Sequence, residues 1–308
     1  MNVVFVKQAQ LPCRSLHRVV SRACAVALFA GAMAGVGTTA THAAGNGEAA
    51  KPPALASDFA DKAPIHPWVR PAPKGAEAYF TNLKNGGTYT SPLLVRFGLT
   101  GRGIVPAGSI AGRAGHHHLL VDQPLPLDLK APLPFNANYV HFGSGQMEVV
   151  LDLKPGVHDL RLLLANFEHV LYFVYSKSLQ ITIEKHNPNT TKEQVKGARR
   201  VELLMPPEAG ISSAPFRVGF HASGFNISHA DSKLAQTGHF RLRLTPAGRP
   251  EERIDFEGGH TEVWLQPPEG SYTLLLELID NSAPGNAVLA TSLATRVNVP
   301  LAGARAPL

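Results

Sequence analysis

The sequence predicts an all-β protein made of two tandem immunoglobulin-like antiparallel β-sandwiches. The first observation is local: after residue 77, short runs of alternating apolar and polar residues are interrupted by Gly, Pro or Asn about every eight to twelve residues. The second observation is an internal repeat, in which three blocks of sequence recur in the same order. The third is that no segment combines a long helical period with helix caps. These observations favour strands over helices.

The repeat consists of three pairs of blocks with two offsets. The first two pairs are 123 residues apart, and the third pair is 114 residues apart. The offset changes because one loop is nine residues longer in the first copy. The paired blocks are 87–97 with 210–220, 115–121 with 238–244, and 148–160 with 262–274. We therefore predict one sandwich at 77–185 and a second, divergent sandwich at 200–300.

The segments outside the two sandwiches differ from them in composition. Residues 1–43 are predicted to be a signal peptide, because basic residues precede an Ala-rich apolar stretch that ends in small residues suited to cleavage. Residues 44–76 are rich in Pro and Ala, which is typical of a flexible, extended tether. Residues 186–199 are polar and are predicted to be the linker between the sandwiches, and 301–308 form a tail.

Removal of the signal peptide on export would change the cysteine content and the net charge of the chain. Both cysteines, Cys13 and Cys24, lie in the predicted signal, so the mature chain has no thiol and no disulfide. Loss of the signal lowers the formal net charge from +6 to about +2, which gives no reason to propose a nucleic-acid partner. No later apolar run is long enough to span a bilayer. We expect a periplasmic protein without a transmembrane segment in its mature form.

The second copy indicates which side chains of the first copy face its core. In 238–244 the apolar residues alternate with His and Arg, so the apolar set must point inward. Transferred to the first copy, this alternation places His117 in the core and His116 and His118 on the outward face. The same comparison places His141 outward, between two core residues.

Four histidines of the first copy are therefore candidate metal ligands: His116, His118, His141 and His169. Two histidines at positions i and i+2 share a strand face, and His141 or His169 would supply a third nitrogen. Imidazole suits zinc, copper and nickel, and we expect copper or zinc in an exported protein. The alternative is that His116 and His118 are solvated or form hydrogen bonds with loop backbone, and that the cluster never forms.

Three other polar residues of the first copy receive predictions. Glu168 or Asp122 is expected to serve as an added ligand or as a hydrogen-bond partner of the ligands. His158 aligns with Tyr272, at the corner where immunoglobulin-like domains place a Tyr whose hydroxyl bonds back to the backbone. We predict that His158 has this structural role.

The motifs of the first copy resemble a bacterial family of exported, usually periplasmic, domains of unknown function. The motifs are Gly-His-His-His-Leu-Leu at 115–120, His-Phe-Gly-x-Gly-Gln-x-Glu at 141–148 and Pro-Gly-x-His-x-Leu-x-Leu at 155–162. The resemblance covers about residues 79–185, and the second copy is similar to a divergent member that lost the histidine motifs. It implies export and a folded domain, and it implies no activity.

Three functions agree with these observations. The first is a periplasmic protein that binds a transition metal through the histidine cluster. The second is an envelope interaction module that binds a glycan or a protein, without a metal. The third is a histidine-dependent enzyme, which is the least supported, because the sequence has no recognisable nucleophile setting, carboxylate pair or phosphate-binding loop.

Overall fold

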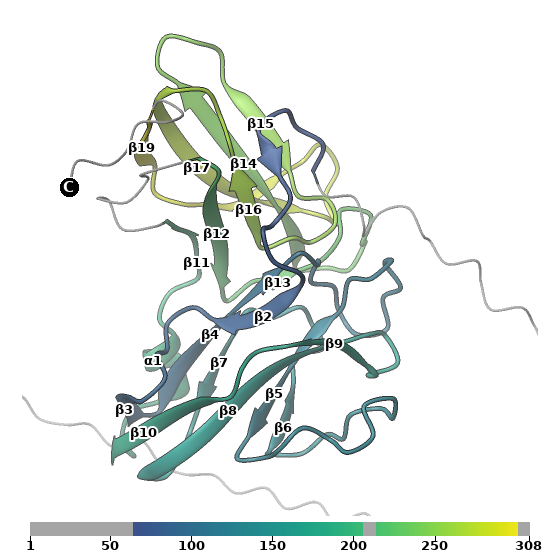
Figure 1. The fold of residues 1–308 in the computed structure, drawn as a ribbon, viewed down its shortest axis with the longest axis vertical. Coiled ribbons are helices and arrows are strands. Elements are labelled where there is room, and N and C mark those ends of the chain that lie inside the picture. Colours follow the sequence, from purple (N-terminus) through teal and green to yellow (C-terminus); the bar gives the residue numbers. More distant parts are fainter. Residues whose placement is uncertain (1–63, 206–213, 301–308) are drawn as a thin grey trace, which may run out of the picture. The chain divides into compact units, whose positions relative to one another are not determined.

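The computed structural model describes residues 64–205 and 214–300 (Figure 1). Its strands form two sandwiches that correspond to the two copies of the repeat. The predicted all-β fold with two tandem antiparallel sandwiches is therefore confirmed. The predicted signal peptide, the tether up to residue 63 and the tail at 301–308 lie outside the described residues.

The first sandwich contains a three-stranded and a six-stranded sheet. The small sheet has, in spatial order, β2 (Glu77–Phe80), β4 (Leu93–Thr100) and β7 (Glu148–Leu151). The large sheet has β3 (Gly87–Ser91), β10 (Leu179–His186), β8 (Gly156–Ala165), β5 (His116–Val121) and β6 (Tyr139–His141), with β9 (Leu171–Tyr175) also paired to β8. The pairs are antiparallel except β3 with β10, and β5 lies in the interior of the large sheet.

The second sandwich repeats this plan. One sheet has, in spatial order, β1 (Val69–Arg70), β16 (Glu262–Leu265), β12 (Phe216–Ser223) and β11 (Arg200–Leu204). The other has β13 (Asn226–Ile227), β14 (Thr237–Pro246), β17 (Gly270–Asp280) and β18 (Val288–Thr291), with β15 (Glu252–Asp255) paired to β14 and β19 (Thr295–Val299) paired to β17. Arg241 faces Asp255 across β14 and β15, as His118 faces His141 across β5 and β6. The two pairs therefore occupy equivalent positions at the two offsets of the repeat.

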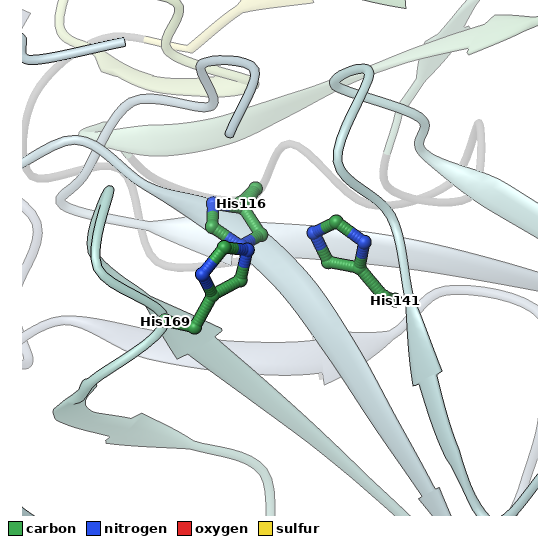
Figure 2. A group of neighbouring side chains, drawn as sticks. All are labelled: His116, His141 and His169. Atoms are coloured by element: carbon green, nitrogen blue, oxygen red, sulfur yellow. The ribbon is translucent and has the colours of Figure 1, made fainter. Parts of the chain in front are cut away.

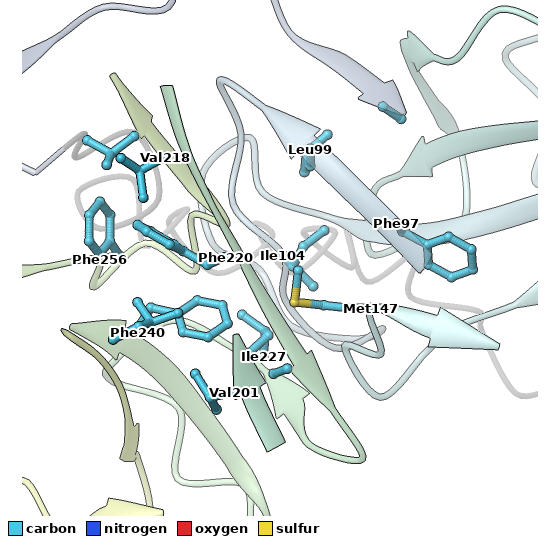
Figure 3. Packing of buried hydrophobic residues seen from close by; sticks show 14 of the residues in the cluster. Phe97, Leu99, Ile104, Met147, Val201, Val218, Phe220, Ile227, Phe240 and Phe256 are labelled. Carbon is cyan, nitrogen blue, oxygen red and sulfur yellow. The ribbon is translucent and has the colours of Figure 1, made fainter. Parts of the chain in front are cut away.

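Aromatic side chains from facing sheets fill the interior of each sandwich (Figure 3). In the first copy Phe97 contacts Phe142, with ring centroids 4.7 Å apart, and it also contacts His117 at 5.4 Å. In the second copy Phe220 contacts Phe256 at 4.7 Å. Each large side chain buried in this way stabilises the fold by about 1.5–3 kcal/mol. Because Phe97 belongs to this core, its contact with His117 confirms that His117 points inward.

The segment at 64–76 differs from the predicted tether. Its residues Val69 and Arg70 form β1, which pairs antiparallel with β16 of the second sandwich. Trp68 packs edge-on against Tyr272 of that sandwich, with ring centroids 5.8 Å apart. The pairing satisfies backbone groups along a sheet edge that would otherwise be open. Composition alone did not reveal it, because a two-residue strand has no periodicity of its own.

The predicted linker at 186–199 contains a short helix. Helix α1 (Lys192–Lys196) begins after Thr191, whose side-chain oxygen accepts a hydrogen bond from the Gln194 backbone N–H. The Gln194 side chain accepts one from the Thr191 backbone N–H in return. This reciprocal cap satisfies two backbone groups that a single helical turn leaves unpaired. No helix of the described residues is long and apolar enough to cross a membrane.

The two sandwiches are joined by equivalent backbone hydrogen bonds. The Ile104 N–H donates to the Gly259 carbonyl, and the Ile227 N–H donates to the Gly145 carbonyl, each at 2.9 Å. Ile104 aligns with Ile227, and Gly145 aligns with Gly259, at the two offsets of the repeat. The same bond therefore forms once in each direction, as in the self-complementary interface of a twofold dimer.

The corner residue is used in the same way by both copies. The His158 Nε2 lies 2.8 Å from the Lys154 carbonyl, and the Tyr272 hydroxyl donates to the Pro268 carbonyl at 2.7 Å. Both acceptors lie four residues before the donor. The predicted structural role of His158 is therefore confirmed.

Candidate metal centre

Three histidines, His116, His141 and His169, gather on the outward face of the large sheet of the first sandwich (Figure 2), and His118 lies beside His116. His116 and His118 lie on β5, and their i, i+2 spacing puts both side chains on one face. His141 ends β6 and is directly opposite His118. His169 lies in the loop that follows β8, whose last residue, Ala165, pairs with His116. The antiparallel pairing of β5 with both neighbours therefore brings the three segments together.

The imidazole nitrogens of this cluster lie close to one another. One ring nitrogen of each of His116, His141 and His169 lies within 4.8 Å of the others. The Nε2 atoms of His116 and His118 are 3.1 Å apart. The ring of His118 also lies 4.9 Å from that of His141, measured between centroids. The structure thus brings together all four histidines that the sequence nominated; their role as ligands stays a prediction.

The backbone of His169 is held in an uncommon conformation. Its φ is 65°, in the left-handed region that a non-glycine residue seldom adopts. The Asn166 side-chain oxygen accepts hydrogen bonds from the backbone N–H groups of Glu168 and Val170, at 2.9 and 2.8 Å. The Leu133 N–H donates to the His169 carbonyl at 2.9 Å. Strained residues of this kind are concentrated at functional sites, and here the strain presents an imidazole to the cluster.

The long loop between β5 and β6 covers the outward face. His116 and His118 are fully buried although they point outward, so the alternative that they are solvated is wrong. The loop buries apolar side chains against this face in a second, smaller cluster, which consists of Leu120, Leu125, Leu129, Leu133, Tyr139, Leu163, Ala165 and Leu171. This loop contains the nine-residue difference in length between the copies. Sequence comparison located the extra residues but not their packing.

Phe135 of the same loop forms an aromatic cap over the histidines. Its ring centroid lies 4.8 Å from that of His169, 4.9 Å from that of His141 and 6.0 Å from that of His118. Its own side chain is partly open to solvent. Sequence reasoning did not nominate Phe135, because a loop position has no periodicity from which a direction can be read.

Gly143 leaves room for the His141 ring. A Cβ atom at this position would overlap the Cε1 and Nε2 atoms of His141. The aligned residue of the second copy is Glu257, so that copy accepts a side chain at this place. The position of the His141 ring therefore explains why the His-Phe-Gly motif ends in Gly.

The buried histidines are neutral. Burial, followed by the neighbouring histidines, lowers the pKa of His116 to about 3 and that of His118 to about 2. Burial and His169 also lower the pKa of His141. Among the described residues, the Nδ1 atoms of His116 and His118 have no hydrogen-bond partner. A neutral imidazole keeps a lone pair, which is the state that binds a metal ion.

The two carboxylates suggested as partners are not part of the cluster. The Asp122 Oδ2 lies 2.8 Å from the His158 Nδ1, at the corner of the sandwich, so its predicted role at the metal site is wrong. The side chain of Glu168 is exposed. The candidate site therefore consists of four imidazoles and an aromatic cap.

The same face of the second copy carries charged side chains instead. Arg241, at the position of His118, donates from Nε to Asp255 at 2.6 Å, and Asp255 stands at the position of His141. The Nδ1 of His239, which aligns with His116, lies 2.6 Å from the Asn281 side-chain oxygen. Although burial raises the pKa of Asp255, His239 and Arg241 outweigh it and lower that pKa. These polar groups thus satisfy one another's hydrogen-bonding capacity.

Comparisons with known proteins identify both copies. The family model of a domain of unknown function, DUF4399, matches residues 95–184 and 218–299, which together exceed half of the chain. No curated protein matches. The solved structures that resemble the chain include the following three.

The fibronectin(III)-like modules of CbhA from Clostridium thermocellum are 10% identical over 73% of this chain and 94% of that chain, with a TM-score of 0.22. The FN1–FN3 domains of chicken CNTN1 are 11% identical over 71% of this chain and 65% of that chain, with a TM-score of 0.21. The chicken interferon gamma receptor alpha chain is 9% identical over 72% of this chain and 98% of that chain, with a TM-score of 0.20.

Proposed function

This chain belongs to the family of the domain of unknown function DUF4399 and carries that domain twice, and we propose that its first copy holds a metal ion. The ion is copper or zinc, the ligands are His116, His118, His141 and His169, and the protein is an exported, periplasmic binding protein. The second copy serves as a scaffold without a metal. The predicted family of unknown function, present in two copies, is confirmed by the two matched regions.

The observation that carries this proposal is the convergence of three imidazoles from separate elements. Two nitrogens bound to one ion at about 2.0–2.1 Å lie at most about 4.2 Å apart. The candidate nitrogens of His116, His141 and His169 lie within 4.8 Å of one another, so small side-chain movements suffice to complete a coordination shell. His118 lies close enough to supply a fourth nitrogen.

The chemistry of the ligands supports a borderline metal ion. An all-nitrogen set disfavours calcium and magnesium, which take oxygen ligands. It suits zinc and copper, and burial lowers the pKa of His116 and of His118, which favours the neutral imidazoles whose lone pairs bind a metal ion. An interaction module without a metal and a histidine-dependent enzyme stay as predictions from the sequence, and no contact at this site favours either.

Titration with Zn(II) and Cu(II) tests the proposal. We expect the purified protein to bind one ion per chain, and the His116→Ala/His118→Ala variant to bind at least about a hundred times more weakly, since two of four ligands are lost. His239→Ala is the matched control, because it removes the aligned histidine of the second copy. Equal affinity in the wild type and in the double variant would sink the proposal.

A further inference from the structure

We propose that the metal of this site is copper and that the site holds it as Cu(I). This inference rests on the proposed function and deepens it. Imidazole binds both oxidation states of copper, so the ligand atoms alone do not decide between them. The surroundings of the four histidines decide between the two oxidation states.

The first argument is the charge of the site. Among the described residues, the group of neighbouring ligand atoms consists of histidine nitrogens alone and includes no carboxylate oxygen. Asp122 is bonded to His158, and the Glu168 side chain is exposed. A bound ion would therefore keep its full charge.

The second argument is burial. His116 and His118 are 0% exposed, His141 and His169 are partly exposed, and Phe135 of the loop between β5 and β6 packs on His118. The cost of transferring an ion out of water grows with the square of its charge, so a divalent ion costs roughly four times as much as a monovalent one in the same surroundings. A site without a compensating anion thus favours Cu(I) over Cu(II), and also over Zn(II).

The third argument is the lack of acceptors behind the ligands. Histidine ligands commonly donate their second ring N–H to a carboxylate or a carbonyl, which makes the imidazole a stronger electron donor. The Nδ1 atoms of His116 and His118 have no such partner among the residues 64–205 and 214–300. Strong electron donation by the ligands stabilises Cu(II) more than Cu(I). Ligands that donate weakly therefore favour Cu(I).

The fourth argument is the cap. Phe135 places its ring 4.8–6.0 Å from three of the imidazoles, measured between centroids. An aromatic ring excludes water without adding a formal charge, and its face attracts a cation weakly. The cap therefore suits a monovalent ion more than an ion that requires neutralisation.

The test compares the affinities of the purified protein for Cu(I), Cu(II) and Zn(II). Cu(I) is made without oxygen by ascorbate, which supplies the one electron that each Cu(II) takes up, and is competed with a chromophoric Cu(I) chelator. Cu(II) and Zn(II) are competed with chelators of known affinity. We expect Cu(I) to have the lowest dissociation constant, with one ion per chain.

The Phe135→Glu variant adds the missing carboxylate beside the imidazoles. We expect the ratio of the Cu(II) to the Cu(I) dissociation constant to fall at least about tenfold, which corresponds to a midpoint potential about 59 mV lower. Leu127→Glu is the matched control: it places the same charge in the same loop, on a side chain that is fully exposed, and leaves the ratio unchanged. Circular dichroism verifies that both variants fold.

The outcomes separate this inference from the proposed function. Tighter binding of Cu(II) or Zn(II) than of Cu(I), or an unchanged ratio in folded Phe135→Glu, overturns the Cu(I) assignment and leaves the metal site standing. Failure to bind any of the three ions overturns both. If Phe135→Glu does not fold, the comparison of the three ions in the wild type decides alone.

Discussion

The two copies of the sandwich share their strands and registers, and they use the same outward face in opposite ways. In the first copy this face carries four imidazoles beneath a long loop. In the second copy an Arg241–Asp255 ion pair and a His239–Asn281 hydrogen bond occupy the aligned positions. The side chains of the second copy satisfy one another, whereas those of the first retain unpaired nitrogens. The comparison teaches that the core specifies the fold, while a few outward residues and one loop specify the site.

Glu148 and Glu262 occupy aligned positions, and their replacement tests how each copy supports the other. Glu148 is buried and accepts hydrogen bonds from the Ser223 hydroxyl at 2.7 Å and the Gly224 N–H at 3.2 Å, and it lies 3.0 Å from the His221 Nε2. Burial raises its pKa, but His221 and Ser223 outweigh this effect and lower it. We expect Glu148→Ala to lower the free energy of unfolding by about 3 kcal/mol, because buried polar partners lose their acceptor.

Glu262→Ala should cost less, about 1 kcal/mol. Glu262 accepts from the Tyr79 hydroxyl and from Arg217, whose side chain is 39% exposed and regains water when the carboxylate is removed. Urea denaturation of both variants at neutral pH provides the measurement. The two carboxylates are equally buried, so a cost for Glu262→Ala equal to or above that of Glu148→Ala would contradict the role assigned to the burial of their partners, His221 and Arg217.

Gly143→Ala tests whether the histidine site constrains the backbone of the first copy. The added methyl group would displace the His141 ring, so we expect metal affinity to fall about tenfold, or about 1.4 kcal/mol. Gly75→Ala is the control, because a Cβ there meets no atom within 4 Å. Competition with a chelator measures both variants, and unchanged affinity in Gly143→Ala would show that His141 is not a ligand.

The corner residues predict a small difference in pH dependence. Burial lowers the pKa of His158, but the bonds to the Lys154 carbonyl and to Asp122 outweigh it and raise that pKa above its ordinary value. Protonated His158 therefore stabilises the folded state below its unfolded pKa of about 6.5, and this contribution disappears as pH rises through the higher folded value. Tyr272, at the aligned corner, makes the same backbone bond through a hydroxyl.

Thermal unfolding between pH 6 and pH 9 measures this effect. We expect the wild type to lose a little stability over the interval and His158→Tyr to lose less. His116, His118 and Glu148 do not change protonation in this window, because their pKa values are lowered. The idea fails if His158→Tyr follows the wild-type curve.

The sequence by itself determined the features that depend on alternation and repetition. In 238–244 of the second copy, apolar residues alternate with His and Arg. Because strand side chains alternate between faces, the aligned residues of the first copy showed that His117 points inward. The turn before His158 likewise predicted its bond to the backbone. Each of these inferences uses residues close together in sequence or aligned between the copies.

Only the tertiary structure decided how distant segments meet. It brought His169 to His116 through the pairing of β5 with β8, and it folded the long loop over an outward face that the sequence predicted to be polar. It also paired β1 with the second sandwich. Such contacts join residues far apart in the chain, and they form because burying the loop leucines and pairing a free sheet edge lower the free energy of the whole fold. No local sequence pattern indicates this decrease in free energy.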